Sequence, residues 1–115
     1  MIERIKYKGK ELAIIIRNTF QKDGIEFFTD DNLSQQLAYM NHPKGKGIQP
    51  HVHNPIKREV HYTQEVLFIK KGRLRVDFYT EKQKYLESRE LEAGDIILLI
   101  QGGHGFEVLE DLEMF

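Results

Sequence analysis

His51 and His53 are separated only by Val52, and this spacing is the clearest chemical signal in the chain. In a β-strand, side chains two positions apart lie on the same face. If this segment is a strand, both imidazoles project from one wall with their Cα atoms about 6.6–7 Å apart, close enough to reach one metal ion. The spacing therefore predicts a pair of metal ligands.

Glu65 and His104 are the residues that could complete such a centre. Glu65 is acidic at the start of an otherwise apolar run, and His104 lies in the glycine-rich segment 101–105. Three imidazoles and one carboxylate suit a divalent transition metal such as Zn, Fe, Ni, Mn or Co, and they do not choose among these metals. An octahedral ion with four protein ligands keeps two positions for water, substrate or dioxygen, which is what Lewis-acid or redox chemistry requires.

His61 and Tyr62 are the candidate catalytic residues beside these ligands. His61 precedes Glu65 by four residues, so it shares the face of Glu65 if the strand is regular. It is open whether His61 is a further ligand, a base near the metal or a surface residue, and whether Glu59 joins the site. Tyr62 contacts substrate if this segment lines the mouth of a cavity. His42, in a loop with prolines and glycines, is expected to be exposed.

The segments that must position these residues show a period of two nearly everywhere. No segment carries a helical stripe longer than two turns, and short apolar or alternating runs are separated by turn residues. The pair Lys71-Gly72 predicts the turn of a hairpin, with Leu74, Val76 and Phe78 on one face of its second strand. The predicted strands are residues 12–17, 25–29, 33–40, the segment of His51 and His53, 65–70, 73–80, 85–91, 95–100, 106–109 and 112–115. Many short strands of this kind predict an all-β sandwich or barrel.

Length and composition limit the class of protein. A chain of 115 residues predicts a single domain spanning 1–115. Lys and Arg number 17 against 18 Asp and Glu, a balance that does not suggest a nucleic-acid-binding surface. The longest apolar runs, 12–16 and 96–100, are too short to span a bilayer, and the charged N-terminal segment does not look like a signal peptide. With no cysteine, disulfides and thiolate metal sites are excluded, and a cytoplasmic protein is expected.

Two stretches of the chain, roughly 45–72 and 94–106, resemble the two motifs of the cupin superfamily. The matching residues are Gly45, His51, His53, Glu65 and Gly72 in the first motif, and Gly94, Asp95 and His104 in the second. Eleven residues separate His53 from Glu65 where the family usually has three or four, which predicts either an enlarged loop or a shifted first ligand strand. Ile100 stands where the family has proline, and only one residue separates Gly102 from His104 where two are usual.

The resemblance implies a small antiparallel β-barrel of jelly-roll type in which His51, His53, Glu65 and His104 hold a divalent metal. It also implies a single-domain cupin that acts on a small polar metabolite and forms a homodimer, with an edge strand in the N-terminal region 2–17. Two other functions stay open. One is a metal-free isomerase or epimerase of a sugar or sugar nucleotide, whose histidines act as general acid and base. The other is a non-catalytic module that binds a small ligand.

Overall fold

A computed structural model describes residues 1–115, the whole chain. Tertiary contacts divide it into two compact units, which are described separately. Met1–Phe20 and Tyr62–Phe115 form the half-barrel unit, and Gln21–His61 form the hairpin unit. The single domain expected over residues 1–115 stays a prediction.

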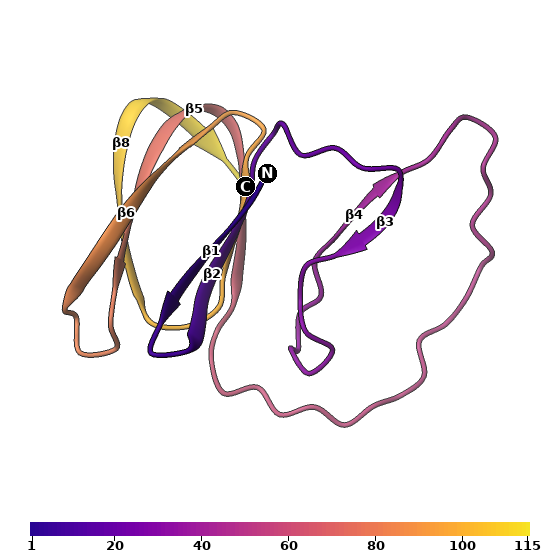
Figure 1. Ribbon diagram of the computed structural model, residues 1–115, viewed down its shortest axis with the longest axis horizontal. Coiled ribbons are helices and arrows are strands. Elements are labelled where there is room, and N and C mark those ends of the chain that lie inside the picture. Colours follow the sequence, from indigo (N-terminus) through magenta and orange to yellow (C-terminus); the bar gives the residue numbers. More distant parts are fainter. The chain divides into compact units, whose positions relative to one another are not determined.

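The half-barrel unit is one antiparallel, strongly curled sheet (Figure 1). Its strands are β1 (Ile2–Tyr7), β2 (Lys10–Ile16), β5 (Glu65–Tyr79), β6 (Tyr85–Glu92), β7 (Ile96–Leu99) and β8 (Gly103–Met114). The hydrogen-bonded order is β1-β2-β7-β5-β6, and β8 pairs with β5. The long strand β5 therefore organises the sheet, pairing with β7 along its first part and with β6 and β8 along its second.

The hairpin unit contains one small sheet, in which β3 (Gly24–Phe27) pairs with β4 (Ala38–Asn41) in antiparallel register. The strand expected over residues 33–40 is therefore reduced to its last part, because residues 31–35 form a turn followed by a bend. Residues 42–61 contain no strand. Arg58 anchors part of this irregular segment by donating hydrogen bonds to the carbonyl oxygens of Asp31 and Leu33. The eleven residues between His53 and Glu65 all lie outside strands.

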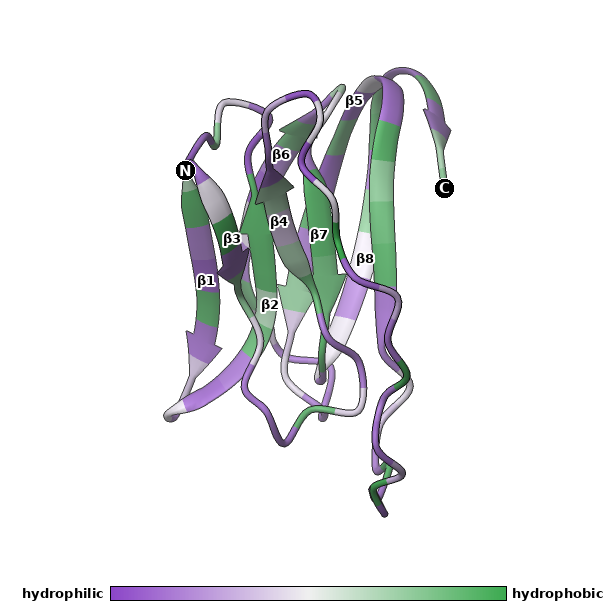
Figure 2. Cartoon of the chain, turned by 90° about the vertical axis from the view of Figure 1, so that its right-hand side faces the viewer, coloured by the Kyte–Doolittle hydropathy of each residue, from purple (hydrophilic) through white to green (hydrophobic).

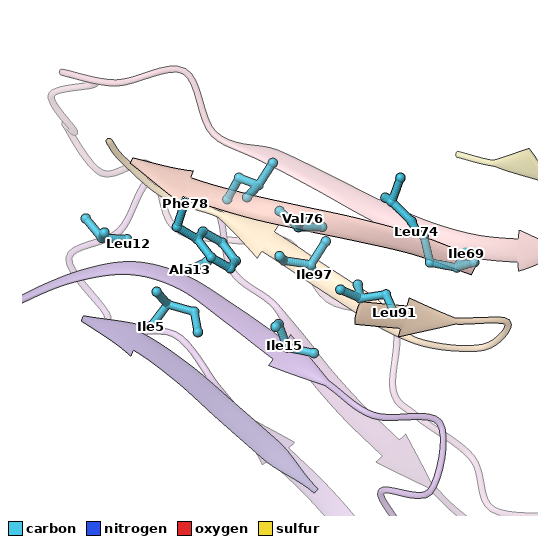
Figure 3. Packing of buried hydrophobic residues seen from close by; sticks show 11 residues of the cluster. Ile5, Leu12, Ala13, Ile15, Ile69, Leu74, Val76, Phe78, Leu91 and Ile97 are labelled. Carbon is cyan, nitrogen blue, oxygen red and sulfur yellow. The ribbon is translucent and has the colours of Figure 1, made fainter. Parts of the chain in front are cut away.

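A cluster of buried side chains fills the concave side of the half-barrel unit (Figure 3). Its members come from β1, β2, β5, β6 and β7, and they point toward one another across the curled sheet. They are Ile5, Leu12, Ala13, Ile15, Ile69, Leu74, Val76, Phe78, Leu91, Ile97 and Leu99. Burial of each large aliphatic or aromatic side chain contributes roughly 1.5–3 kcal/mol, which makes this cluster the main source of stability in the unit.

β2 and β7 are the most hydrophobic strands of the sheet (Figure 2). Every residue from Leu12 to Ile16 is buried, and so are Ile97, Leu98 and Leu99. A strand that is buried on both faces has a continuous apolar sequence in place of an alternating one. The strands predicted over residues 12–17 and 95–100 are found as β2 and β7, with slightly different bounds.

Gly72 lies inside β5 and does not form the turn of a hairpin, so the predicted hairpin is wrong. Its φ is +92°, and the pairing of β5 with β8 shifts register on both sides of it. The residues of β5 that face the core are Leu67 and Ile69 before this point, and Leu74, Val76 and Phe78 after it. An inserted residue at a bulge reverses the alternation of a strand, so odd positions face inward before Gly72 and even positions after it.

Asp95 fixes the start of β7 from a fully buried position. Its side chain is 1% exposed and accepts hydrogen bonds from Arg17 Nη1 at 3.0 Å, Asn18 N at 2.8 Å and Glu92 N at 2.9 Å. A buried carboxylate is tolerated when it is paired and fully hydrogen-bonded in this way. Asp95 therefore has a structural role.

Arg17 extends this network to β1 and β6. It donates to Glu3 at 2.6 Å and to the Glu90 carbonyl oxygen at 2.6 Å, and Arg89 lies 3.6 Å from Glu3. The hydrogen bond from Arg17 holds the pKa of Glu3 below its ordinary value, and the charges of Arg17 and Arg89 act in the same direction. These ion pairs join the two end strands of the path β1-β2-β7-β5-β6, which stabilises the curl of the sheet.

The all-β class and the antiparallel pairing are confirmed, with a half-barrel sheet and a small two-stranded sheet. The two late strands predicted at 106–109 and 112–115 form the single strand β8. The structure contains no helix, and hence none that is long and apolar enough to cross a membrane.

Candidate metal centre

Glu65 and His104 come together on the concave side of the half-barrel unit. Glu65 is the first residue of β5 and is paired with Leu99, a core residue, so the two side chains share the inner face. His104, the second residue of β8, is paired with Phe78, which also belongs to the core. His104 Nε2 lies 4.0 Å from Glu65 Oε1, and the two side chains are 29% and 49% exposed.

This separation suits two ligands of one metal ion. Ligand atoms that are each 2.0–2.2 Å from an ion lie about 3–4 Å from one another. The carboxylate supplies negative charge and the imidazole a nitrogen donor, so the pair is chemically suited to Zn, Fe, Ni, Mn or Co. The partial exposure of both side chains leaves an ion access from solvent.

The bulge at Gly72 is what allows this pair to form. Glu65 lies at an odd position and Phe78, the partner of His104, at an even position of the same strand. In a regular strand these two positions would face opposite sides of the sheet. Because the alternation reverses at Gly72, Glu65 and His104 share the concave face.

His51 and His53 lie in irregular chain of the hairpin unit, and the strand predicted for them is wrong. Their rings are nevertheless neighbours, with centroids 5.3 Å apart and planes at 70°. His51 Nδ1 donates to the Gln49 carbonyl oxygen at 3.0 Å, because that oxygen can only accept. This hydrogen bond places the proton of a neutral ring on Nδ1 and leaves Nε2 with the lone pair that a metal requires.

His61 and Tyr62 are not part of β5, which begins at Glu65. The strand alternation that was to place His61 on the face of Glu65 is therefore absent. His61 Nε2 lies 3.2 Å from Glu59 Oε2, and the two side chains are 71% and 77% exposed. Tyr62 is 44% exposed. Catalytic roles for His61 and Tyr62 stay predictions.

His42 is half-buried, and its Nε2 atom is buried without a hydrogen-bond partner, so the expectation that it is exposed is wrong. Within each unit, no group of three or more His, Asp or Glu side chains is arranged to hold a metal ion. Each unit instead contains one pair: Glu65 with His104 in the half-barrel unit, and His51 with His53 in the hairpin unit. A centre made of all four residues stays a prediction.

Comparisons of the chain with protein-family models, with curated proteins and with solved structures give no match.

Proposed function

We propose that the chain is a single-domain cupin of jelly-roll type that binds a divalent transition metal through His51, His53, Glu65 and His104. The observation that carries this proposal is the approach of Glu65 and His104 to 4.0 Å on the concave face of one sheet. A carboxylate beside an imidazole on the inner face of a curled sheet offers a cation both a negative charge and a nitrogen donor. The ring pair of His51 and His53 supplies the other two nitrogen donors.

The substrate in this proposal is a small polar metabolite, and the protein is an enzyme. A bound metal ion with open positions would polarise a carbonyl or hydroxyl group, or activate dioxygen. Glu65 and His104 would hold the ion and fix its position relative to the apolar core beneath. His61 and Tyr62 would transfer protons to and from the substrate, a task for which the exposure of both side chains gives access.

The test is metal binding by calorimetry and elemental analysis, using paired variants. We expect the wild-type chain to bind one equivalent of a divalent transition metal. The double variant Glu65→Gln with His104→Ala and the double variant His51→Ala with His53→Ala should each weaken binding by at least about 100-fold, because each removes two ligands. Glu113→Gln, which removes an exposed carboxylate from the same strand as His104, is the matched control and should bind normally.

Two outcomes would overturn the four-ligand centre. The first is a wild-type chain that binds no divalent transition metal. The second is metal binding that depends on one pair of ligands and is indifferent to the other. In that case the two pairs do not act on the same ion, and the similarity to the cupin motifs does not extend to their chemistry.

The contact between Glu65 and His104 also favours a second function, a metal-free isomerase or epimerase of sugars or sugar nucleotides. A histidine next to a carboxylate can serve as a general acid or base without a metal. Turnover that survives chelation and depends on His104 would support this function over the first. Tight binding of small ligands without turnover would instead indicate a non-catalytic binding module.

We also propose a cytoplasmic protein and a homodimer. The homodimer is supported by β1, which pairs only with β2 and so has one edge without a partner strand in the sheet. Such an edge can be extended by a strand from a second chain.

A further inference from the structure

A cavity of about 470 Å³ lies at one end of the half-barrel unit, and its lining includes neither Glu65 nor His104. Three connections meet there: the turn between β1 and β2, the turn between β5 and β6, and the segment between β7 and β8. A volume of this size falls within the range of about 300–1,000 Å³ that is typical of small-molecule sites. The cavity is therefore large enough for a metabolite.

Each of the two turns is held by its own local geometry. Lys8 and Gly9, the two residues between β1 and β2, have φ values of 49° and 77°, which is the conformation of a type I′ hairpin turn. In the other turn Thr80 N donates to the Lys84 carbonyl oxygen at 2.9 Å, and Lys84 N donates to Thr80 Oγ1 at 3.1 Å. The side chains on both turns thus project from defined backbones.

The third connection closes the cavity against β2. Ile100 N donates to the Leu12 carbonyl oxygen at 2.8 Å, and Gln101 Nε2 donates to the Glu11 carbonyl oxygen at 3.1 Å. Gly102 has a φ of +81°, and a Cβ there would lie 3.0 Å from the Tyr79 carbonyl oxygen and 3.3 Å from Leu12. This close packing places the apolar Leu12 side chain in the cavity wall.

The charges around the cavity are strongly unbalanced. Four of the residues that line it are lysines, whereas Glu81 is the only acidic one. The lysines are Lys8, Lys10, Lys82 and Lys84, and none of them forms an ion pair. Lys8 Nζ lies 5.4 Å from the centroid of the Tyr7 ring, a cation–π contact at the rim. The chain as a whole is nearly neutral, with a formal net charge of −1, so this excess of positive charge is local.

From this arrangement we propose that the end cavity binds an anionic small molecule of the phosphate-ester class. The lysine ammonium groups bind the phosphate, and Tyr7 and Leu12 contact the apolar part of the ligand. Ammonium groups at the rim of a partly apolar cavity attract an anion. Because these lysines form no ion pair, no carboxylate of the protein competes with the ligand for them. This site does not depend on the metal centre, because it shares no residue with it.

The experiment uses phenyl phosphate as the probe, because it joins a dianion to an apolar ring. Binding is followed by NMR through the Gln101 and Gly102 amides, in buffer that contains a chelator so that metal binding cannot contribute. We expect saturable shifts of these amides with phenyl phosphate, weaker shifts with inorganic phosphate and none with phenol. Binding should also weaken as salt concentration rises, since exposed charges are screened.

The paired variants make the test specific. Lys82→Gln with Lys84→Gln should weaken phenyl phosphate binding about tenfold, because two exposed charge contacts are lost. Lys44→Gln with Lys46→Gln removes the same charge from two exposed positions outside the cavity and should leave binding unchanged. Because Lys82 and Lys84 lie on an exposed turn, their variant should keep the thermal unfolding midpoint of the wild type, which we would measure in parallel.

Equal weakening in both double variants would overturn the proposal, because it would show general attraction of anions to a positive surface. Shifts that fail to saturate, or that appear at residues remote from the cavity, would overturn it as well. If binding survives the change of Lys82 and Lys84 to Gln but is lost in Tyr7→Ala, the cavity recognises the apolar ring of the probe, and the assignment of its ligand as an anion is wrong.

Discussion

At the scale of single residues, the pairing of Glu65 with His104 shows what residue type and spacing can predict. The sequence marks both residues as candidate ligands, because acidic and imidazole side chains bind metals and here stand at unusual positions. Their 4.0 Å contact depends on the pairing of β5 with β8 and on the register at Phe78. The resemblance of the motifs placed both residues at one metal ion, but no local rule supplies the register by which β5 and β8 bring them together.

Glu3 provides a prediction about pH. Its pKa is lowered in the folded chain, chiefly by the hydrogen bond from Arg17. A carboxylate with a lowered pKa stabilises the fold at pH values above its unfolded pKa, about 4.3, and this stabilisation is lost as the pH falls through the folded value. Glu3→Gln should therefore lower the free energy of unfolding at pH 7, and its difference from the wild type should shrink at pH 3.

Urea denaturation of both chains at the two pH values measures this difference. Glu113→Gln is the control, since Glu113 is exposed and forms no ion pair. It should match the wild type at both pH values. If Glu3→Gln is as stable as the wild type at pH 7, the ion pairs that join Glu3 of β1 to Arg17 and to Arg89 of β6 do not stabilise the curl of the sheet.

At the scale of elements, Gly72 explains both a failed prediction and a feature of the candidate site. A glycine with positive φ suits a hairpin turn and a bulge equally well, so the pair Lys71-Gly72 could not distinguish between them. The choice depends on whether the following residues fold back or continue along β8 and β6. Only the long-range pairing of β5 with those two strands decides it.

Gly72→Ala should therefore be strongly destabilising. Alanine at this position would have to adopt a φ of +92°, and its Cβ would lie 2.1 Å from the Asp111 carbonyl oxygen. We expect a loss of more than about 2 kcal/mol in the free energy of unfolding, measured by urea denaturation. Metal binding at Glu65 and His104 should weaken in the same variant, because these residues share a face only through the bulge.

Gly9→Ala separates the two causes of this loss, which are the strained backbone and the steric overlap with the Asp111 carbonyl oxygen. Gly9 also has a positive φ, +77°, but a Cβ there meets no atom within 4 Å. The change at Gly9 should cost only the backbone strain, about 1 kcal/mol. Equal losses in Gly9→Ala and Gly72→Ala would show that the close approach of Asp111 to Gly72 is unimportant.

At the scale of the whole molecule, the open edge of β1 leads to a prediction about assembly. Because Arg17 N donates to the Met1 carbonyl oxygen, Ile2 and Ile16 form a non-hydrogen-bonded pair, and the Ile2 N–H points away from β2. Ile2→Pro therefore removes a donor from the open edge and leaves the ladder with β2 intact. If the homodimer forms by strand addition at β1, this variant should be monomeric.

Light scattering coupled to size-exclusion chromatography measures the mass directly. The wild-type chain should give twice the 13.6 kDa of the single chain, and Ile2→Pro should give 13.6 kDa with an unchanged far-UV spectrum. Lys6→Gln, a change of side chain on the same strand that keeps its N–H, should remain dimeric. A wild-type chain that is monomeric at all concentrations would contradict the predicted homodimer.

Local sequence signals predicted the elements of this protein better than their connections. The apolar runs of β2 and β7 and the alternation of Leu74, Val76 and Phe78 follow from burial, which acts on each segment by itself. The segment of His51 and His53 is irregular, so the strand predicted for it is absent. The lysine-lined cavity cannot be predicted from the sequence, because its residues belong to three separate connections that only the folded sheet brings to one end.

The sequence by itself determined the all-β class, the buried strands and the residue types able to bind a metal, because hydrophobic burial and side-chain chemistry are properties of residues and short segments. The tertiary structure decided that Gly72 is a bulge, that Glu65 meets His104, and that four lysines surround one cavity. These features depend on the register between strands that are distant in the chain. That register is set by the packing of the whole core, which no single segment encodes.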